Sequence, residues 1–324
     1  MVYLIVIIAL FFLTIKGYCG KKTSTAVRDT GDSVLFNFVR MVFCVIIGAA
    51  LVFAEGSGGS LRVDGGMLAI CAFSGIANAA FLVGWLMAVR KNSMVAMDVG
   101  MTLGSLLPAL LCLVLFGQPI SVPKMIGFAF ILGATVILAG HSKKTAGGGF
   151  SGILLLIIAT LGDGLSSFSQ QLYKEYYTEA GAHAAEKIYP KSVFHFYTYV
   201  FAAAVLLLVF AAFWIWDANK KKNKRPETEK VSELTESKKR LYIPIRVLAH
   251  IGVMAVCLFA ANYLQTVATN DYGMSSQVLY PIIKGGCLIT VNFVAMIFFN
   301  EKMTWRSIVG SLVALVGIIV MNVL

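Results

Sequence analysis

The feature that most constrains this chain is a series of long apolar stretches joined by short polar connections. A helix needs about 20 apolar residues to cross a bilayer. Ten stretches approach that length: 2–20, 33–54, 66–89, 93–116, 122–140, 151–174, 192–216, 244–269, 274–298 and 304–323. Lipid offers the backbone no hydrogen-bond partners, and β-barrel strands would alternate apolar with polar residues. We therefore predict an all-α integral membrane protein with ten transmembrane helices.

The composition supports this class and argues against several others. The chain is 58% hydrophobic and only 13% charged, whereas soluble domains are about one quarter charged. Its net charge of +11 lies in the connections and not on a basic folded domain, so we expect no nucleic-acid partner. The six cysteines lie scattered in or beside apolar stretches, which is typical of buried thiols rather than of a metal site or a disulfide framework.

Lys and Arg are distributed unequally between the two sets of connections. They are concentrated after the odd-numbered stretches, above all in the charged segment 217–243. Positive residues remain on the cytoplasmic side of membranes. We therefore place segment 217–243 in the cytoplasm and both termini outside, in a multi-pass protein of the cell (plasma) membrane of a bacterium.

The last stretch of the chain has a weaker copy near the middle. "NEKMTWRSIVGSLVALVGIIVMNVL" closes the chain at 300–324, and "GQPISVPKMIGFAFILGATVILAG" occupies 117–140. In this alignment Glu301 matches Gln118, Thr304 matches Ser121, and Gly310 matches Gly127. A second pair, "SVLFNF" at 33–38 and "SVFHF" at 192–196, opens the second and the seventh stretch. Each half would hold five spans, an odd number, so the second half is predicted to be inverted relative to the first.

These residues resemble the EamA-type drug/metabolite transporter superfamily, whose halves end in an acidic or amide residue, a Ser or Thr, and a Gly that opens the last helix. The resemblance implies two inverted five-helix repeats, at 1–141 and 150–324, with a central cavity between them. It also implies a secondary transporter of a small polar metabolite or drug-like solute, surrounded by membrane lipid and using a coupling proton or none. Two departures are the missing acid at Gln118 and the long charged segment 217–243.

Other functions are weighed against this one. A flippase-like or auxiliary membrane subunit of the same superfamily would have the same spans. A membrane-embedded enzyme would need a cluster of catalytic residues, but the four histidines are dispersed and no Walker or G-x-S-x-G motif is present. We expect neither catalysis nor a cofactor.

Two stretches in matching positions of the halves are interrupted by Pro and Gly, which is the best sequence pointer to a transporter's binding site. The first, 93–116, contains Asp98 and Thr102, and the second, 274–298, contains Gln277, Tyr280 and Lys284. A lone ammonium near the middle of the membrane is costly. Lys284 is therefore expected to pair with Asp98 or Asp163, or else to meet an anionic substrate.

The other candidates are polar residues within spans, where polarity is rare and is therefore informative. Asp163, Ser167 and Gln170 form a helical stripe, and Asp163 is predicted either to carry a coupling proton or to tie two helices together. Arg40 lies toward one end of its stretch, and we expect it to extend to the membrane interface. The predicted substrate-binding set is Asn78, Trp85, Asp98, Thr102, Asp163, Gln170, Asn262, Gln265, Gln277, Tyr280 and Lys284, with hydrogen bonding between helices as the alternative role of the amides.

The orientation gives a direct prediction. In intact cells, a cysteine-reactive reagent that cannot cross the membrane should label Ser57→Cys, whereas Asn223→Cys should react only after the cytoplasmic side is made accessible. The unmutated chain, with its six native cysteines, serves as the control. The reverse labelling pattern would overturn the orientation and leave the helix assignment intact.

Overall fold

The structure is a computed structural model of the chain. It describes residues 1–91, 101–102, 104–118, 120–142, 149–179, 181, 187–222, 243–300 and 305–323. Over these ranges it contains ten α-helices and one short 3-10 helix, and no strand. The helices are α1 (Val2–Ser24), α2 (Thr30–Ala54), α3 (Gly65–Lys91), α5 (Leu106–Phe116), α6 (Val122–Ser142), α7 (Gly149–Tyr177), α8 (Lys191–Lys222), α10 (Ile245–Asn270), α11 (Ser276–Phe299) and α12 (Trp305–Val323), with η1 at Ser57–Leu61.

The all-helical prediction is confirmed in these ranges, and seven helices are long and apolar enough to cross a membrane. They are α1, α2, α3, α7, α8, α10 and α11. The three remaining helices, α5, α6 and α12, contain shorter apolar segments of 10–17 residues. By the lengths and the composition of its helices, the chain is therefore a multi-pass membrane protein.

The distribution of side chains is the reverse of that in a soluble protein. Large apolar residues such as Leu208 (70% exposed) and Val136 (72% exposed) lie on the outside of the bundle. Polar and charged residues lie inside it, including Asn78, Asp163 and Lys284. An apolar exterior suits lipid, while the interior must provide partners for the polar groups that it encloses.

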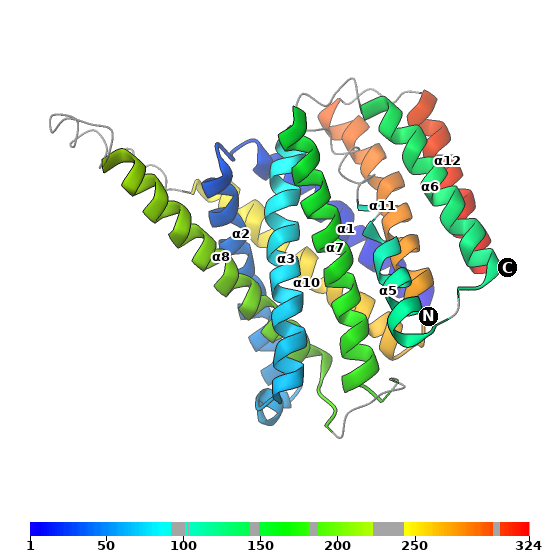
Figure 1. Cartoon of the computed structure of the whole chain (residues 1–324), viewed down its shortest axis with the longest axis horizontal. Coiled ribbons are helices and arrows are strands. Elements are labelled where there is room, and N and C mark those ends of the chain that lie inside the picture. The colour runs from blue at the N-terminus through cyan, green and yellow to red at the C-terminus, as the bar shows by residue number, and fades with distance from the viewer. Residues whose placement is uncertain are drawn as a thin grey trace.

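The most extensive helix contacts join the first half of the chain to the second. α1 packs along α10, α2 along α8, α3 along both α7 and α8, and α6 along α12. Figure 1 shows this interleaving, with α6 beside α12 at one edge of the bundle and α3 beside α7 near its centre. The two halves therefore share their packing surfaces.

Glycines permit the closest of these contacts. A Cβ placed on Gly162 of α7 would lie 2.8 Å from the Ala77 carbonyl oxygen and 2.6 Å from the Phe81 amide nitrogen of α3. On α12, a Cβ at Gly317 would lie 2.9 Å from the carbonyl oxygen of Gly127 on α6. Small residues allow helix backbones to approach in lipid, where packing replaces the hydrophobic effect as the driving force.

In the stretch 93–116, which the sequence marks as interrupted by Pro and Gly, a turn at Ser105 precedes α5. Two other local features differ from the sequence expectations. By contrast, α11 continues through Pro281 and the two glycines that follow it. Helix α8 reaches Lys222, so residues 217–222 of the predicted charged connection are helical. A membrane-spanning helix can continue past its apolar part as a polar helix in water.

The ends of the chain and the far end of α8 mark opposite sides of the molecule. Both termini lie toward the right in Figure 1, whereas the C-terminal end of α8 leans out of the bundle at the upper left. Trp214 and Trp216 are exposed near that end of α8. Tryptophans are enriched where membrane meets water, so their position agrees with a membrane boundary just before segment 217–243.

The glycine contacts predict a stability difference. Gly162→Ala should lower the free energy of unfolding by about 1–3 kcal/mol, because the added methyl group overlaps the backbone of α3. Gly133→Ala is the matched control, since a Cβ at that helical glycine meets nothing within 4 Å. Unfolding of both variants in detergent gives the comparison, and equal stability would contradict the close approach of α7 to α3.

Candidate functional site

An ion pair lies at the centre of the bundle. The Lys284 ammonium on α11 donates to Asp163 Oδ1 on α7 at 2.7 Å and lies 2.7 Å from Oδ2 as well. Both side chains are buried, at 8% and 9% exposure. Among the described residues Oδ2 accepts no hydrogen bond, so its contact with Lys284 is an ion pair alone. Of the partners expected for Lys284, the structure shows Asp163; Asp98, the other expected acid, is not among the described residues.

Helices of both halves place their polar residues around this pair. A narrow cavity, here called the central cavity, is lined by residues of α1, α3, α7, α10 and α11. Six of the predicted site residues line it: Asn78, Asp163, Gln170, Asn262, Gln265 and Lys284. Its volume is about 20 Å³, which is room for about one water molecule. The fold therefore brings these residues together in a closed conformation.

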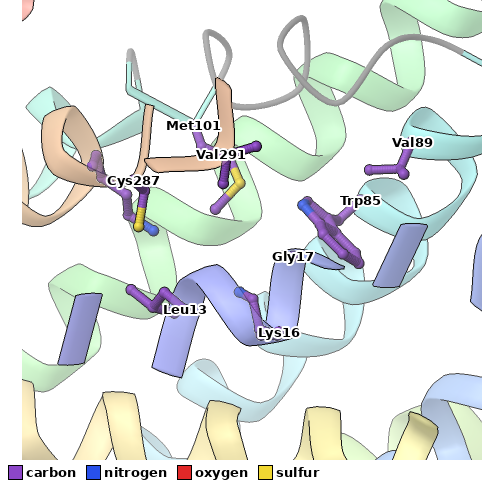
Figure 2. Close-up of a pocket in the computed structure, with 9 residues that line it drawn as sticks. Leu13, Lys16, Gly17, Trp85, Val89, Met101, Cys287 and Val291 are labelled. Carbon is purple, nitrogen blue, oxygen red and sulfur yellow. The ribbon is translucent and has the colours of Figure 1, made fainter. Parts of the chain in front are cut away.

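A second cavity, here called the adjoining cavity, shares Leu13, Lys16 and Lys284 with the first. Trp85 forms part of its wall, and Figure 2 shows the indole of Trp85 near Lys16. Val89 near the end of α3 also lines it. The adjoining cavity therefore extends from the ion pair toward the end of the bundle where α1 and α3 terminate, which the charge distribution predicts to be cytoplasmic.

A chain of hydrogen bonds fixes Gln170 in the cavity wall. Its Oε1 accepts from Thr266 of α10 and from Tyr280 of α11, each at 3.3 Å. Thr266 in turn lies 3.0 Å from His195 Nε2 of α8, and Gln171 donates to the Tyr280 hydroxyl at 3.3 Å. Four helices thus fix the orientation of this amide in the cavity wall.

The remaining predicted residues have different positions. Gln277 lies away from the cavity, where it accepts from Lys124 at 3.1 Å and donates to the Gln118 carbonyl at 3.3 Å. Thr102 is fully buried next to Met101, which lines the adjoining cavity. Asp98 lies outside the described residues. Gln277 is thus a contact between the halves, although it shares a helix with Lys284.

Polar contacts close the bundle at the end opposite the adjoining cavity. Besides the contacts of Gln277, the amide of Gln118 donates to Glu175 at 2.8 Å. The Tyr263 hydroxyl donates to Glu55 at 2.7 Å, again between the halves. The contacts of Gln118 and Gln277 lie near the connection from α5 to α6, and the contact of Glu55 lies where α2 ends.

Two buried cations were not assigned to the site from the sequence. Lys16 of α1 is 5% exposed and lines both cavities. In sequence, a buried lysine one turn before the end of a span looks the same as a lysine that extends to the interface. Only the nearby glycines, Gly17 and Gly20, indicated that this side of the helix is packed. The expectation that Arg40 extends to the interface is wrong. Arg40 is 1% exposed, because α2 packs it against Met254 of α10 and against Trp85.

The described residues contain no group of three or more His, Cys, Asp or Glu side chains suited to a metal ion. All six cysteines are free and buried. The polar groups around the central cavity are amides, hydroxyls, one carboxylate and ammonium groups. Such a set can bind a polar solute by hydrogen bonds and charge.

Known proteins resemble this chain in fold and not in sequence. No family model matches the sequence, and no curated protein matches it. A solved structure described as "Crystal structure of protein" is similar, with a TM-score of 0.68 and 13% sequence identity. The similarity covers 99% of this chain and 96% of that chain. At this identity the likeness shows a shared fold, which extends over nearly the full length of both chains.

The buried ion pair predicts a characteristic pattern of stabilities. Lys284→Met alone should cost about 3–5 kcal/mol, because it leaves the Asp163 carboxylate buried without its cation. The double variant Lys284→Met/Asp163→Asn should recover most of that loss. Unfolding in detergent measures all three proteins, and additive losses in the double variant would show that the two groups do not act as a pair.

Proposed function

We propose that this chain is a secondary transporter that moves a small polar solute through the central cavity, between two inverted repeats. The observation that carries the proposal is a polar cavity enclosed by helices of both halves, inside a bundle whose exterior is apolar. A purely structural bundle in lipid has no need to bury an ion pair and several amides around one space, since such groups are costly there.

The pattern of helix packing supports the inverted repeat. If the ten spans are numbered in chain order, α1 on α10 pairs span 1 with span 8, and α3 on α7 pairs span 3 with span 6. Exchanging the halves converts one of these pairs into the other. In the same way α3 on α8 corresponds to α2 on α10, while α2 on α8 and α6 on α12 each correspond to themselves. Two similar halves related by a two-fold axis would produce this pattern.

The one-sided closure supports alternating access. Contacts between the halves close one end, while the adjoining cavity reaches toward the other. In a transporter of inverted repeats, bundles of helices rock or gate against one another around a site that stays in place. The resemblance of the two repeat ends to the EamA-type superfamily points to the same mechanism.

A metabolite screen followed by transport tests the proposal. Solutes that bind the native protein raise its melting temperature. Each such solute is then offered to proteoliposomes that contain the purified protein and to protein-free liposomes. Uptake only in the presence of protein supports the proposal. Binding without any uptake would overturn it in favour of an auxiliary membrane subunit.

The cavity amide Gln170 gives a sharper prediction. Gln170→Leu should slow uptake by roughly tenfold, since one lost hydrogen bond to the solute corresponds to about 1.4 kcal/mol. Val136→Leu, which changes a residue 72% exposed on the outer surface, should transport normally. Equal uptake by the two variants at matched protein content would place the solute elsewhere.

Coupling to protons is tested at Asp163. A proton arriving at this carboxylate would break its ion pair with Lys284, so Asp163→Asn should abolish uphill accumulation driven by a proton gradient. Asp98→Asn is measured beside it, as Asp98 is the other acid deep within the predicted spans. Full proton-driven accumulation by both variants would exclude these two carboxylates and favour exchange or facilitated diffusion.

A further inference from the structure

Among the described residues around the two cavities, buried positive charge exceeds buried negative charge. Lys16 and Lys284 line both of them, and the Arg40 guanidinium lies behind Trp85, 5.9 Å from the ring centre. Asp163 is the one carboxylate that lines the cavities within the described ranges. If Asp98 is counted as well, because the sequence places it within a span, three cations still face two acids.

Lys16 contributes most to this excess of buried positive charge. Within the described chain its ammonium forms no hydrogen bond and no ion pair, although the side chain is 5% exposed. The groups beside it are aromatic, with the Phe81 ring at 5.2 Å and the Trp85 ring at 5.6 Å. Cation–π contacts stabilise an ammonium, yet they leave its N–H donors without acceptors. Figure 2 shows Lys16 rising from α1 between Leu13 and Trp85.

Arg40 adds a second cation without an acceptor in the described chain. Its Nε and Nη1 atoms are buried and have no hydrogen-bond partner there, and Nη2 reaches only the sulfur of Met254 at 3.5 Å. Unpaired buried charges are rare in proteins and rarer in lipid, because the cost of removing them from water must be offset by a counter-charge. Arg40 does not line the cavities. Its positive charge acts on them across the Trp85 ring.

The packing holds this arrangement in place. A Cβ on Gly20 of α1 would overlap the Cη2 and Cζ3 atoms of Trp85, so the indole lies directly on the glycine backbone. Gly20 thereby brings the ring close to the helix that carries Lys16. The aromatic wall, the ammonium of Lys16 and the ammonium of Lys284 then border one continuous space.

We propose that this space binds a small soluble anion, a carboxylate or phosphate compound, with Lys16 as its principal contact and Lys284 as the second. The inference rests on the proposed function only in placing the solute in the same cavities. An anion gives Lys16 an acceptor that no described residue provides, and it offsets the excess charge that Arg40 adds. In the closed structure Asp163 neutralises Lys284, which leaves Lys16 as the first group to attract the anion.

The proposal is tested by binding to purified full-length protein in nanodiscs of zwitterionic lipid. The probes are sodium phosphate and sodium malate, and the control solutes are sodium chloride at equal ionic strength and glucose. Phosphate or malate should raise the melting temperature in a saturable manner that neither control solute reproduces. The apparent Kd should weaken by about tenfold or more in Lys16→Met, because a charge-assisted hydrogen bond is lost.

Matched variants separate charge from structure. Lys16→Arg should retain binding, and so should Lys22→Met, which removes the same charge from an exposed position on the same helix. Lys16→Met without ligand should be at least as stable as the unmutated protein, since the variant removes a buried charge for which the described residues offer no acceptor. Should Lys16→Met not fold, Lys16→Gln replaces it in the titration.

Three results would overturn the proposal: no larger response to phosphate or malate than to sodium chloride and glucose, an unchanged Kd in Lys16→Met or Lys16→Gln, or stabilisation only when the nanodiscs contain anionic lipid. The last result would assign the cations to a lipid headgroup. Anion binding without uptake in proteoliposomes would leave this site in place and overturn only the transport function. Uptake of a neutral or cationic solute without anion binding would do the opposite.

Discussion

The ion pair between Lys284 and Asp163 joins α11 to α7 at the centre of a bundle that lipid surrounds. Either charge alone would destabilise the bundle, because removing an ion from water costs several kcal/mol. The pair therefore requires the two helices to keep their register and their facing sides. The polar groups that line the central cavity are arranged around this contact, and the apolar residues are left to face outward.

The interleaving of the two halves determines how such a bundle can move. Because α1 packs on α10 and α3 on α7, neither half has an interior of its own. Close contacts at glycines such as Gly162 and Gly317 permit little independent tilting of single helices. Motion is then expected at the ends, where the polar contacts of Gln118 and Glu175 can break and be replaced by water. Our proposed transport mechanism depends on those contacts and not on the core.

The sequence by itself determined the helical class, the number of apolar stretches and much of the cavity wall. Residues such as Asn78, Asp163, Gln170 and Lys284 could be selected because a polar side chain in an apolar stretch must find an internal partner. The sequence could not determine which partner each would find. Pairing depends on the rotation of every helix about its axis, which the contacts between α7, α10 and α11 decide. For that reason the sequence could assign Lys284 a buried role but could not single out Asp163 as its partner.

Only the tertiary structure decided the position of Lys16, Arg40 and Gln277. A cation within a turn or two of the end of a span can either extend to the interface or face the interior, and the sequence pattern is the same in both cases. Packing of α2 against α8 and α10 turns Arg40 inward, and packing of α1 against α3 does the same for Lys16. Gln277 shares the helix of Lys284 yet contacts the start of α6, because seven residues carry it about 10 Å along the helix axis, out of the cavity. The distance between two residues along and around one helix follows from the sequence. Which residues of other helices face them depends on how the neighbouring helices pack.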